Sequence, residues 1–306
     1  MNKVTNWINQ QDHILIDSSM STGLEERGLK LNSNLWTAAA LESHEDLIVD
    51  VHKKYFDAGS SVTTTNTYQA SVPGLIKAGY SEDEAIALIK KAVELADRGR
   101  NESSNPNPKW ILGGVGPYGA FLANGSEYTG DYSLTDEEYI AFHEGRIKAM
   151  VEAGIDILIL ETFPNINELK AITKYTKQFD IPVIVAASLR DESHLADGSS
   201  LIEVASFLES QEHVIAYGLN CTKPQLVTPT LNVLKQSHPA HKPFIAFPNS
   251  GATYNPEIKE WNHDDLSFEE FDKLIAEWFD LDLKFVGGCC CMTEAQEQHI
   301  YDKFFK

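Results

Sequence analysis

Short runs of β-branched and other apolar residues alternate with longer amphipathic runs along almost the whole chain. The short runs predict strands, and the fourth of them is apolar nearly throughout, as a strand covered on both faces should be. The predicted strands cover residues 13–17, 61–66, 110–114, 156–162, 182–188, 214–220, 243–249 and 284–288. This spacing predicts a sheet of about eight strands with other elements packed against it.

The longer runs predict the helices that separate these strands. Thr135, with acidic residues just after it, is a typical helix start. A polar segment with prolines, residues 101–108, leads into the third predicted strand. Helices are predicted at residues 45–58, 82–98, 135–153, 200–210 and 268–279, with two more that open near residues 224 and 293.

The alternation of strands and helices continues over 306 residues without a break in composition. It predicts a (β/α)₈ barrel, the TIM-barrel fold, as a single domain over residues 1–306. The alternative is an open doubly wound sheet, which normally has fewer repeats and a glycine-rich phosphate-binding turn after its first strand. Here that turn is Asp17-Ser18-Ser19-Met20, without a glycine pair. The barrel is therefore the favoured fold.

Polar and sulfur-bearing side chains come at or just past the C-terminal ends of the predicted strands. In a barrel these ends share one rim, where the active sites of this fold lie. The residues are Asp17, Asn66, Glu161, Asn220, Cys221, Asn249, Cys289 and Cys290. The rim is therefore the predicted functional site.

The four cysteines predict a metal site on this rim. Cys221 ends the sixth predicted strand, and Cys289, Cys290 and Cys291 follow a glycine pair at the end of the eighth. Neighbouring thiolates on a tight turn can meet a distant third thiolate at one ion. Three thiolates leave one tetrahedral position of a zinc ion open, which is typical of a catalytic site. The alternative is that the cysteines pack as small hydrophobic residues.

The composition limits the kinds of partner that the protein can bind and indicates its cellular compartment. A formal net charge of −20 excludes a nucleic-acid ligand, because a polyanion requires a cationic surface. No apolar run approaches the ~20 residues of a membrane helix, and the N-terminus lacks the apolar core of a signal peptide. We therefore expect a cytoplasmic protein without membrane contact. In that compartment a cysteine cluster favours metal binding or catalysis over disulfides.

The chemistry of a three-thiolate zinc site favours alkyl transfer to sulfur. Such an ion has a formal charge near −1, so it polarises carbonyl groups poorly but accepts another thiolate readily. Metal coordination lowers the pKa of an incoming thiol from its ordinary value of about 8.5. With that thiolate the site reaches a charge of about −2. The natural electrophile is therefore a cation, such as a sulfonium or quaternary ammonium methyl donor.

Motifs along almost the full length resemble the homocysteine S-methyltransferase family, and most closely its S-methylmethionine-using branch. The segments that carry the resemblance are 14–17, 24–28, 34–36, 65–71, 115–120, 125–132, 161–164, 218–222 (GLNCT), 248–251 and 287–290 (GGCC). The resemblance implies a zinc-dependent enzyme that moves a methyl group from a cationic donor to homocysteine and produces methionine. S-Methylmethionine is the first donor that it implies, and S-adenosylmethionine is another.

The resemblance also implies the residues of a homocysteine site. Cys221, Cys289 and Cys290 match the three ligands of one Zn²⁺, with the homocysteine sulfur in the open position. Asp17 and Glu161 match the carboxylates that hold the homocysteine ammonium group. The alternative for these two acids is a surface or loop-capping role.

Further positions complete the implied pocket. Main-chain N–H groups around Ser18 and Ser19 are candidates for the substrate carboxylate. Asn220 matches a position beside the metal, with a structural turn as its alternative. Tyr68 matches an aromatic residue of the pocket, with core packing as its alternative. The donor side is expected in the segment 126–132, where Glu127 and Tyr128 could attract a sulfonium, unless the segment is only an ordered loop.

The chain departs from the family pattern at Ser18, Cys291 and Ala252, where glycine, arginine and an acid are usual. Cys291 either competes as a ligand or packs. These departures keep three alternatives open: another thiol or a selenol such as selenohomocysteine as acceptor, betaine as donor, and a zinc-binding or thiol redox-sensing protein on an inactive barrel. The sequence leaves the oligomeric state open, with a homo-oligomer among the alternatives.

Overall fold

The structure is a computed structural model that describes residues 3–31, 35–239, 242–255, 260–262 and 265–306. Asn34, which belongs to one of the family motifs, lies outside these residues. Among the helices that the structure describes, none combines the length and the apolarity that crossing a membrane requires.

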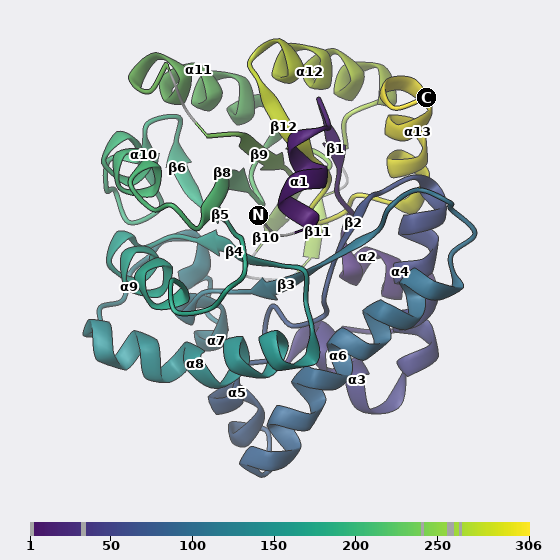
Figure 1. Cartoon of the computed structure of the whole chain (residues 1–306), viewed down its shortest axis with the longest axis vertical. Helices are drawn as coiled ribbons and strands as arrows, with labels where there is room; N and C mark the ends of the chain where they lie inside the picture. Colours follow the sequence, from purple (N-terminus) through teal and green to yellow (C-terminus); the bar gives the residue numbers. More distant parts are fainter. Residues whose placement is uncertain (1–2, 32–34, 240–241, 256–259, 263–264) are drawn as a thin grey trace.

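Eight parallel strands form the central sheet, as the sequence predicts. They are β1 (Ile14–Leu15), β2 (Val62–Thr64), β3 (Trp110–Val115), β4 (Ile157–Phe163), β5 (Val183–Ala187), β8 (Val214–Asn220), β9 (Phe244–Phe247) and β12 (Leu283–Val286). Their order is β1-β12-β9-β8-β5-β4-β3-β2. An isolated parallel bridge between Ile16 and Val62 joins β1 to β2, so the sheet closes on itself (Figure 1). The predicted (β/α)₈ barrel is confirmed.

One long helix follows each strand and packs outside the barrel (Figure 1). These helices are α4 (Glu45–Ala58), α6 (Glu82–Glu102), α8 (Asp136–Ala153), α9 (Ile166–Thr176), α10 (Leu201–Glu209), α11 (Val227–Ser237), α12 (Phe268–Asp280) and α13 (Glu294–Phe304). The sequence pattern predicts all of them except α9. The predicted helix 82–98 extends to Glu102, into the segment expected to be a linker.

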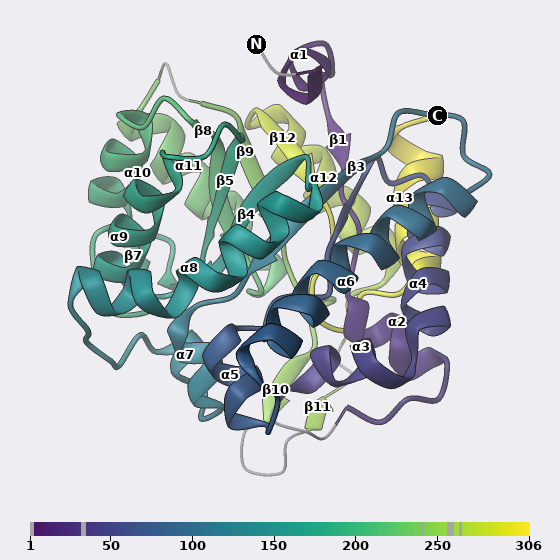
Figure 2. The same cartoon turned by 60° about the horizontal axis from the view of Figure 1, so that its bottom comes forward.

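Shorter helices and two hairpins lie at the two ends of the barrel. They are the helices α1 (Lys3–Asn9), α2 (Met20–Glu26), α3 (Ala40–Ser43), α5 (Val72–Lys77) and α7 (Tyr118–Leu122), the 3₁₀ helices η1 (Trp36–Ala39), η2 (Ser126–Tyr128) and η3 (Pro224–Leu226), and the hairpins β6 (Leu189–Asp191)–β7 (His194–Leu195) and β10 (Thr253–Asn255)–β11 (Glu260–Asn262). The helix α1 and the β10–β11 hairpin lie at opposite ends of the molecule (Figure 2). The strand-to-helix loops therefore gather at the end away from α1.

Local sequence explains where several of these helices begin. At the start of each of four helices, a hydroxyl side chain accepts a hydrogen bond from the main-chain N–H of the residue three positions later. The side chain of that later residue accepts in turn from the main-chain N–H of the first residue. This capping box satisfies N–H groups that a helix start otherwise leaves unpaired. The pairs are Ser81–Glu84, Thr135–Glu138, Ser267–Glu270 and Thr293–Gln296.

The apolar side chains form two layers, one inside the barrel and one between the strands and the outer helices. The inner layer contains large residues from most strands, including Ile14, Leu112 and Ile245. Helix α1 adds Val4 and Ile8 to it, which are 1% and 2% exposed. The helix α1 therefore closes the N-terminal end of the barrel.

Replacing Ile8 by alanine tests the role of α1. We expect Ile8→Ala to lower the free energy of unfolding by about 2–5 kcal/mol, because it removes buried methyl groups and leaves a cavity. The exposed Asn6 on the same helix provides the control, since Asn6→Ala should change stability by less than about 0.5 kcal/mol. Urea titration measures both values. Equal losses of stability in the two variants would contradict the conclusion that buried side chains of α1 close this end of the barrel.

Candidate active site

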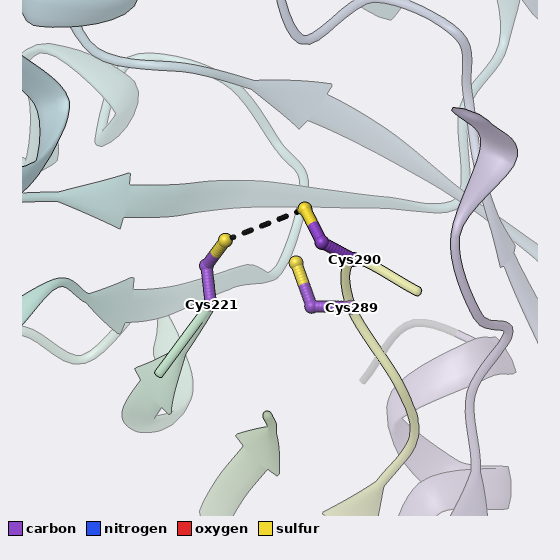
Figure 3. Close-up of side chains that lie close together, drawn as sticks. All are labelled: Cys221, Cys289 and Cys290. Atoms are coloured by element: carbon purple, nitrogen blue, oxygen red, sulfur yellow. Dashed lines mark hydrogen bonds between the residues drawn. The ribbon is translucent and has the colours of Figure 1, made fainter. Parts of the chain in front are cut away.

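Three cysteine sulfurs converge at the C-terminal rim (Figure 3). Cys221 follows β8, and Cys289 and Cys290 follow β12, on the other side of β9. The three sulfur atoms all lie within 4.8 Å of one another, and those of Cys221 and Cys290 are 3.7 Å apart. Around a tetrahedral zinc ion with Zn–S bonds of about 2.3 Å, two sulfurs lie about 3.8 Å apart. The cluster therefore has the spacing that a metal ion requires.

The end of β9 holds the two cysteine segments in register. The main-chain N–H of Cys221 donates to the carbonyl of Phe247 at 3.1 Å, and that of Cys289 donates to the next carbonyl, Pro248, at 2.8 Å. Cys221 also has a φ of +50°, a conformation that is uncommon for a residue with a side chain. The carbonyls of two successive residues at the end of β9 thus fix the positions of Cys221 and Cys289.

Gly287 lets the cysteine turn approach the end of β1. A Cβ atom at this position would lie 2.3 Å from Cγ1 of Ile16 and 2.9 Å from the carbonyl oxygen of Asp17. A side chain here would force the two segments apart. The missing side chain therefore brings the turn that carries Cys289 and Cys290 against the segment that carries Asp17.

Asp17 is a buried carboxylate with fixed orientation. Its Oδ2 accepts from the Thr63 hydroxyl and the Thr64 N–H, both at 2.7 Å, and its Oδ1 accepts from the Thr64 hydroxyl at 2.9 Å. Behind Thr63, the ring nitrogen Nδ1 of His52 lies 2.7 Å from the hydroxyl. Burial is the main cause that raises the pKa of Asp17 to about 7, and the threonine hydrogen bonds partly offset it.

Glu161 brings a second acid to the same region. Its Oε1 lies 2.7 Å from where a Cβ of Gly114 would be, so the carboxyl group packs on the backbone of β3. Burial first, and then the charges of Asp17 and Cys221, raise its pKa to about 8. These influences indicate that Asp17, Glu161 and Cys221 share one pocket of negative charge.

Asn220 makes two hydrogen bonds that join the ends of β4 and β8. Its Oδ1 accepts from the N–H of Thr162, and its Nδ2 donates to the Thr162 hydroxyl, both at 2.8 Å. Thr162 has a φ of +61°, and Cys221 follows Asn220 directly. Both the oxygen and the nitrogen of this fully buried side-chain amide are therefore hydrogen-bonded. The structural alternative for Asn220 is thus the one that its contacts support.

Ser18 and Ser19 form the buried start of the loop after β1. The Ser19 hydroxyl caps α2 by accepting from the N–H of Thr22, and the Ser19 carbonyl accepts from the Tyr55 hydroxyl at 2.8 Å. Within the described part of the chain, the N–H groups of Ser18 and Ser19 donate to no backbone carbonyl. These two N–H groups therefore remain available to a ligand.

The residues expected on the donor side lie beside the sulfurs. The Tyr128 hydroxyl is 3.3 Å from the sulfur of Cys221, within hydrogen-bond range, although 39% of the residue is exposed. Glu127 has a buried Oε2 without a hydrogen-bond partner among the described residues. Burial and the Cys221 charge raise the pKa of Glu127. Burial first, and then the charges of Glu127 and Cys221, raise the pKa of Tyr68.

The departures from the family pattern lie around the cluster rather than in it. Cys291 is not among the three convergent cysteines, and burial raises the pKa of its thiol to about 12. Ala252 is buried, and Asp265 supplies a carboxylate nearby that accepts from the Ser250 hydroxyl. The alternative in which Cys291 packs is therefore the one that fits this geometry.

Several functional neighbours are invisible in the sequence pattern. Thr63 and Thr64 lie within a predicted strand, but alternation alone does not say that they bind Asp17. Arg146 lies in a predicted helix and is only 1% exposed. Its positive charge lowers the pKa of Glu161 and so partly offsets the influences that raise it. A signal for Arg146 exists, since a charged residue on the apolar face of a helix requires a partner.

The fold and the site together define a (β/α)₈ barrel with three cysteines on its rim whose sulfur atoms lie close enough together to hold one metal ion. A family model described as homocysteine S-methyltransferase matches residues 14–303. The chain belongs to this family.

Two curated relatives and one solved structure illustrate the similarity. The chain is 37% identical to the homocysteine S-methyltransferase YbgG of Bacillus subtilis, over 95% of this chain and 94% of that protein. It is 33% identical to a selenocysteine Se-methyltransferase of Brassica oleracea, over 95% and 88%. The metallated form of the homocysteine methyltransferase MmuM from Escherichia coli matches with a TM-score of 0.89 at 33% identity, over 99% of this chain and 100% of that one.

The Asn220–Thr162 pair generates a stability test. We expect Asn220→Ala to lower the free energy of unfolding by about 2–4 kcal/mol, because it leaves buried polar groups of Thr162 unpaired. Asn101, whose amide bonds Asp97 on the surface, is the control, and Asn101→Ala should change stability by less than about 0.5 kcal/mol. Thermal and urea unfolding measure both variants. Similar losses would mean that the pair has no special role.

Proposed function

We propose that this protein transfers a methyl group from a sulfonium donor, S-methylmethionine first, to the thiol of homocysteine. The S–CH₃ bond of the donor breaks as the new S–CH₃ bond forms, so S-methylmethionine and homocysteine give two methionines. The convergence of three sulfurs near the acids Asp17 and Glu161 is the observation that carries the proposal. Family membership supports the same reaction.

The proposed cofactor is one zinc ion. Cys221, Cys289 and Cys290 would hold it, and their spacing and their all-sulfur chemistry suit that metal. When bound, zinc supplies a lowered pKa for a coordinated substrate thiol, so the protein needs no separate general base. Hydrogen bonds from Cys289 and Cys290 lower the pKa of the Cys221 thiol well below its ordinary value.

The amino-acid part of homocysteine would bind between β1 and β4. Asp17 and Glu161 would hold its ammonium group, because two neighbouring carboxylates, of which Asp17 is oriented by the Thr63 hydroxyl, favour a cation. The N–H groups of Ser18 and Ser19, which donate to no backbone carbonyl in the described part of the chain, would donate to its carboxylate. Asn220 would act indirectly, by fixing Thr162 and the start of the Cys221 turn.

The donor would approach from the segment 126–132. The unpartnered Glu127 oxygen offers a negative charge to a sulfonium, and the rings of Tyr68 and Tyr128 offer their faces. Because Tyr128 reaches Cys221, a donor held against it would place its methyl group near the incoming thiol. Holding both sulfur centres in line supplies much of the rate enhancement.

A second acceptor class deserves the same assay. A selenol is chemically close to a thiol, and the selenocysteine Se-methyltransferase among the relatives supports this alternative. Comparing homocysteine with selenohomocysteine and selenocysteine, each against S-methylmethionine, S-adenosylmethionine and betaine, identifies both substrates. A redox-sensing role finds less support, because Cys291 stands apart from the cluster. The single domain over residues 1–306 and the cytoplasmic location remain predictions, and the oligomeric state stays open, with a homo-oligomer among the alternatives.

Cysteine replacements test the metal ligands. We expect Cys221→Ser to lower the zinc content to about a tenth or less and to reduce methionine formation by at least ~10³-fold, because a three-ligand site then loses one thiolate. Cys291→Ser is the matched control and should keep both zinc and activity within about twofold. Metal analysis and an assay on the same preparations measure the two effects. An active, zinc-loaded Cys221→Ser protein would refute the ligand assignment.

The raised pKa of Glu161 generates a pH test. Ammonium binding requires the ionised carboxylate, so the KM for homocysteine should rise as the pH falls below about 8, by up to tenfold per unit. Glu161→Gln cannot ionise at this position; its KM should be higher at pH 8.5 and should start to rise only below about pH 7, where Asp17 becomes protonated. Initial rates at saturating donor between about pH 6 and 9 measure the two profiles. Parallel profiles would argue against a contact between Glu161 and the substrate.

A further inference from the structure

Three buried polar side chains form a continuous relay beneath the proposed donor side. Nη2 of Arg146 donates to Nδ1 of His143 at 2.7 Å, and Nε2 of His143 lies 2.7 Å from Oε1 of Glu168. Arg146 and His143 lie on α8, and Glu168 lies on α9. Their exposures are 1%, 0% and 0%. Burying three such groups requires that each be well paired.

The contacts fix the protonation state of the relay. A guanidinium only donates, so Nδ1 of His143 must accept, and its proton sits on Nε2, facing the carboxylate of Glu168. Burial lowers the pKa of His143 to about 4, which agrees with a neutral ring. Burial also lowers the pKa of Arg146, to about 10, so the arginine stays charged. A neutral imidazole thus connects a buried cation to a buried anion.

The acidic end of the relay holds both ends of one segment. Oε1 of Glu168 accepts from the N–H of Tyr118 at 2.6 Å, and Oε2 accepts from the hydroxyl of Tyr132 at 2.5 Å. The segment 118–132 between them contains α7 and η2, and therefore Glu127 and Tyr128. A single carboxylate thus fixes the beginning and the end of the proposed donor side.

The basic end of the relay holds the neighbouring loops. Nη1 of Arg146 donates to the carbonyl of Tyr68 at 2.8 Å, and Nη2 donates to the carbonyl of Gly116 at 2.7 Å. Gly116 lies against Tyr68, since a Cβ there would come within 2.5 Å of the Tyr68 carbonyl oxygen. The same relay therefore orients Tyr68, the third residue expected to face the donor.

The geometry points to Arg146, His143 and Glu168 as positioning residues that set the affinity for the cationic methyl donor. They touch neither substrate; they act by fixing Glu127, Tyr128 and Tyr68 through the segment 118–132 and its neighbour. This inference rests on the proposed function, because it takes that segment as the donor side. It predicts that loosening the relay weakens donor binding and leaves homocysteine binding intact.

Tyr132→Phe is the sharpest test, since it removes one tether and leaves every charge of the relay in place. Tyr217→Phe is the matched control, because the Tyr217 hydroxyl also donates to a carboxylate, Glu209, at 2.9 Å, between β8 and α10. Hydrogen exchange of peptides from 118–132 reports the tether directly. We expect exchange there to speed up about tenfold or more in Tyr132→Phe and to stay unchanged in Tyr217→Phe.

Kinetics supplies the second readout. In Tyr132→Phe the KM for S-methylmethionine should rise at least about fivefold, with the KM for homocysteine and the zinc content within about twofold of wild type. Glu168→Gln should raise the KM for S-methylmethionine by a larger factor. If Glu168→Gln fails to fold, Tyr132→Phe alone tests the inference.

Two outcomes would overturn the inference: unchanged exchange in 118–132, or faster exchange with an unchanged donor KM or an equal rise in both KM values. A wild-type protein that makes no methionine from any donor would instead overturn the proposed function. The exchange experiment would still decide whether Tyr132 and Glu168 hold the segment, because it requires no turnover. The two failures are therefore distinguishable.

Discussion

The meeting of three thiols from two strand ends at one point on the barrel rim is the constraint on which the site depends. Cys221 and the pair Cys289 and Cys290 are separated by β9, and successive carbonyls at the end of that strand bind the N–H groups of both cysteine segments. The closed parallel sheet thus does more than bring the strand ends together, since it fixes the register between β8, β9 and β12. Without that register the three sulfur atoms would not lie within 4.8 Å of one another.

The electrostatics of the pocket follow mainly from burial. Asp17, Glu161 and Glu127 all have raised pKa values, and burial is the first cause in each. A raised value means that the carboxyl group stabilises the fold below its ordinary pKa of about 4, and that this contribution is lost as the pH rises through about 7 for Asp17 and about 8 for Glu161. Around and above neutral pH, ionisation of these carboxyl groups therefore lowers the stability of the fold.

Much of the fold and part of the site could be predicted from the sequence, for identifiable reasons. Eight β-branched runs, and cysteines just past the ends of two of them, are local signals, so they indicate the barrel and the positions of the sulfurs. Helix α9 was missed, although Asn165 accepts from the N–H groups of Asn167 and Glu168 and is a recognisable cap. The partners of Asp17 and Asn220 could not be read, because Thr63 and Thr162 lie 46 and 58 residues away along the chain.

X-ray absorption at the zinc edge, on zinc-loaded protein with and without homocysteine, tests the central claim most directly because it counts the sulfur atoms bound to the metal. We predict three sulfurs in the protein alone, from Cys221, Cys289 and Cys290, and a fourth when homocysteine is added. A first shell with fewer than three sulfurs, or a sulfur count that homocysteine leaves unchanged, would contradict a thiol-activating metal site.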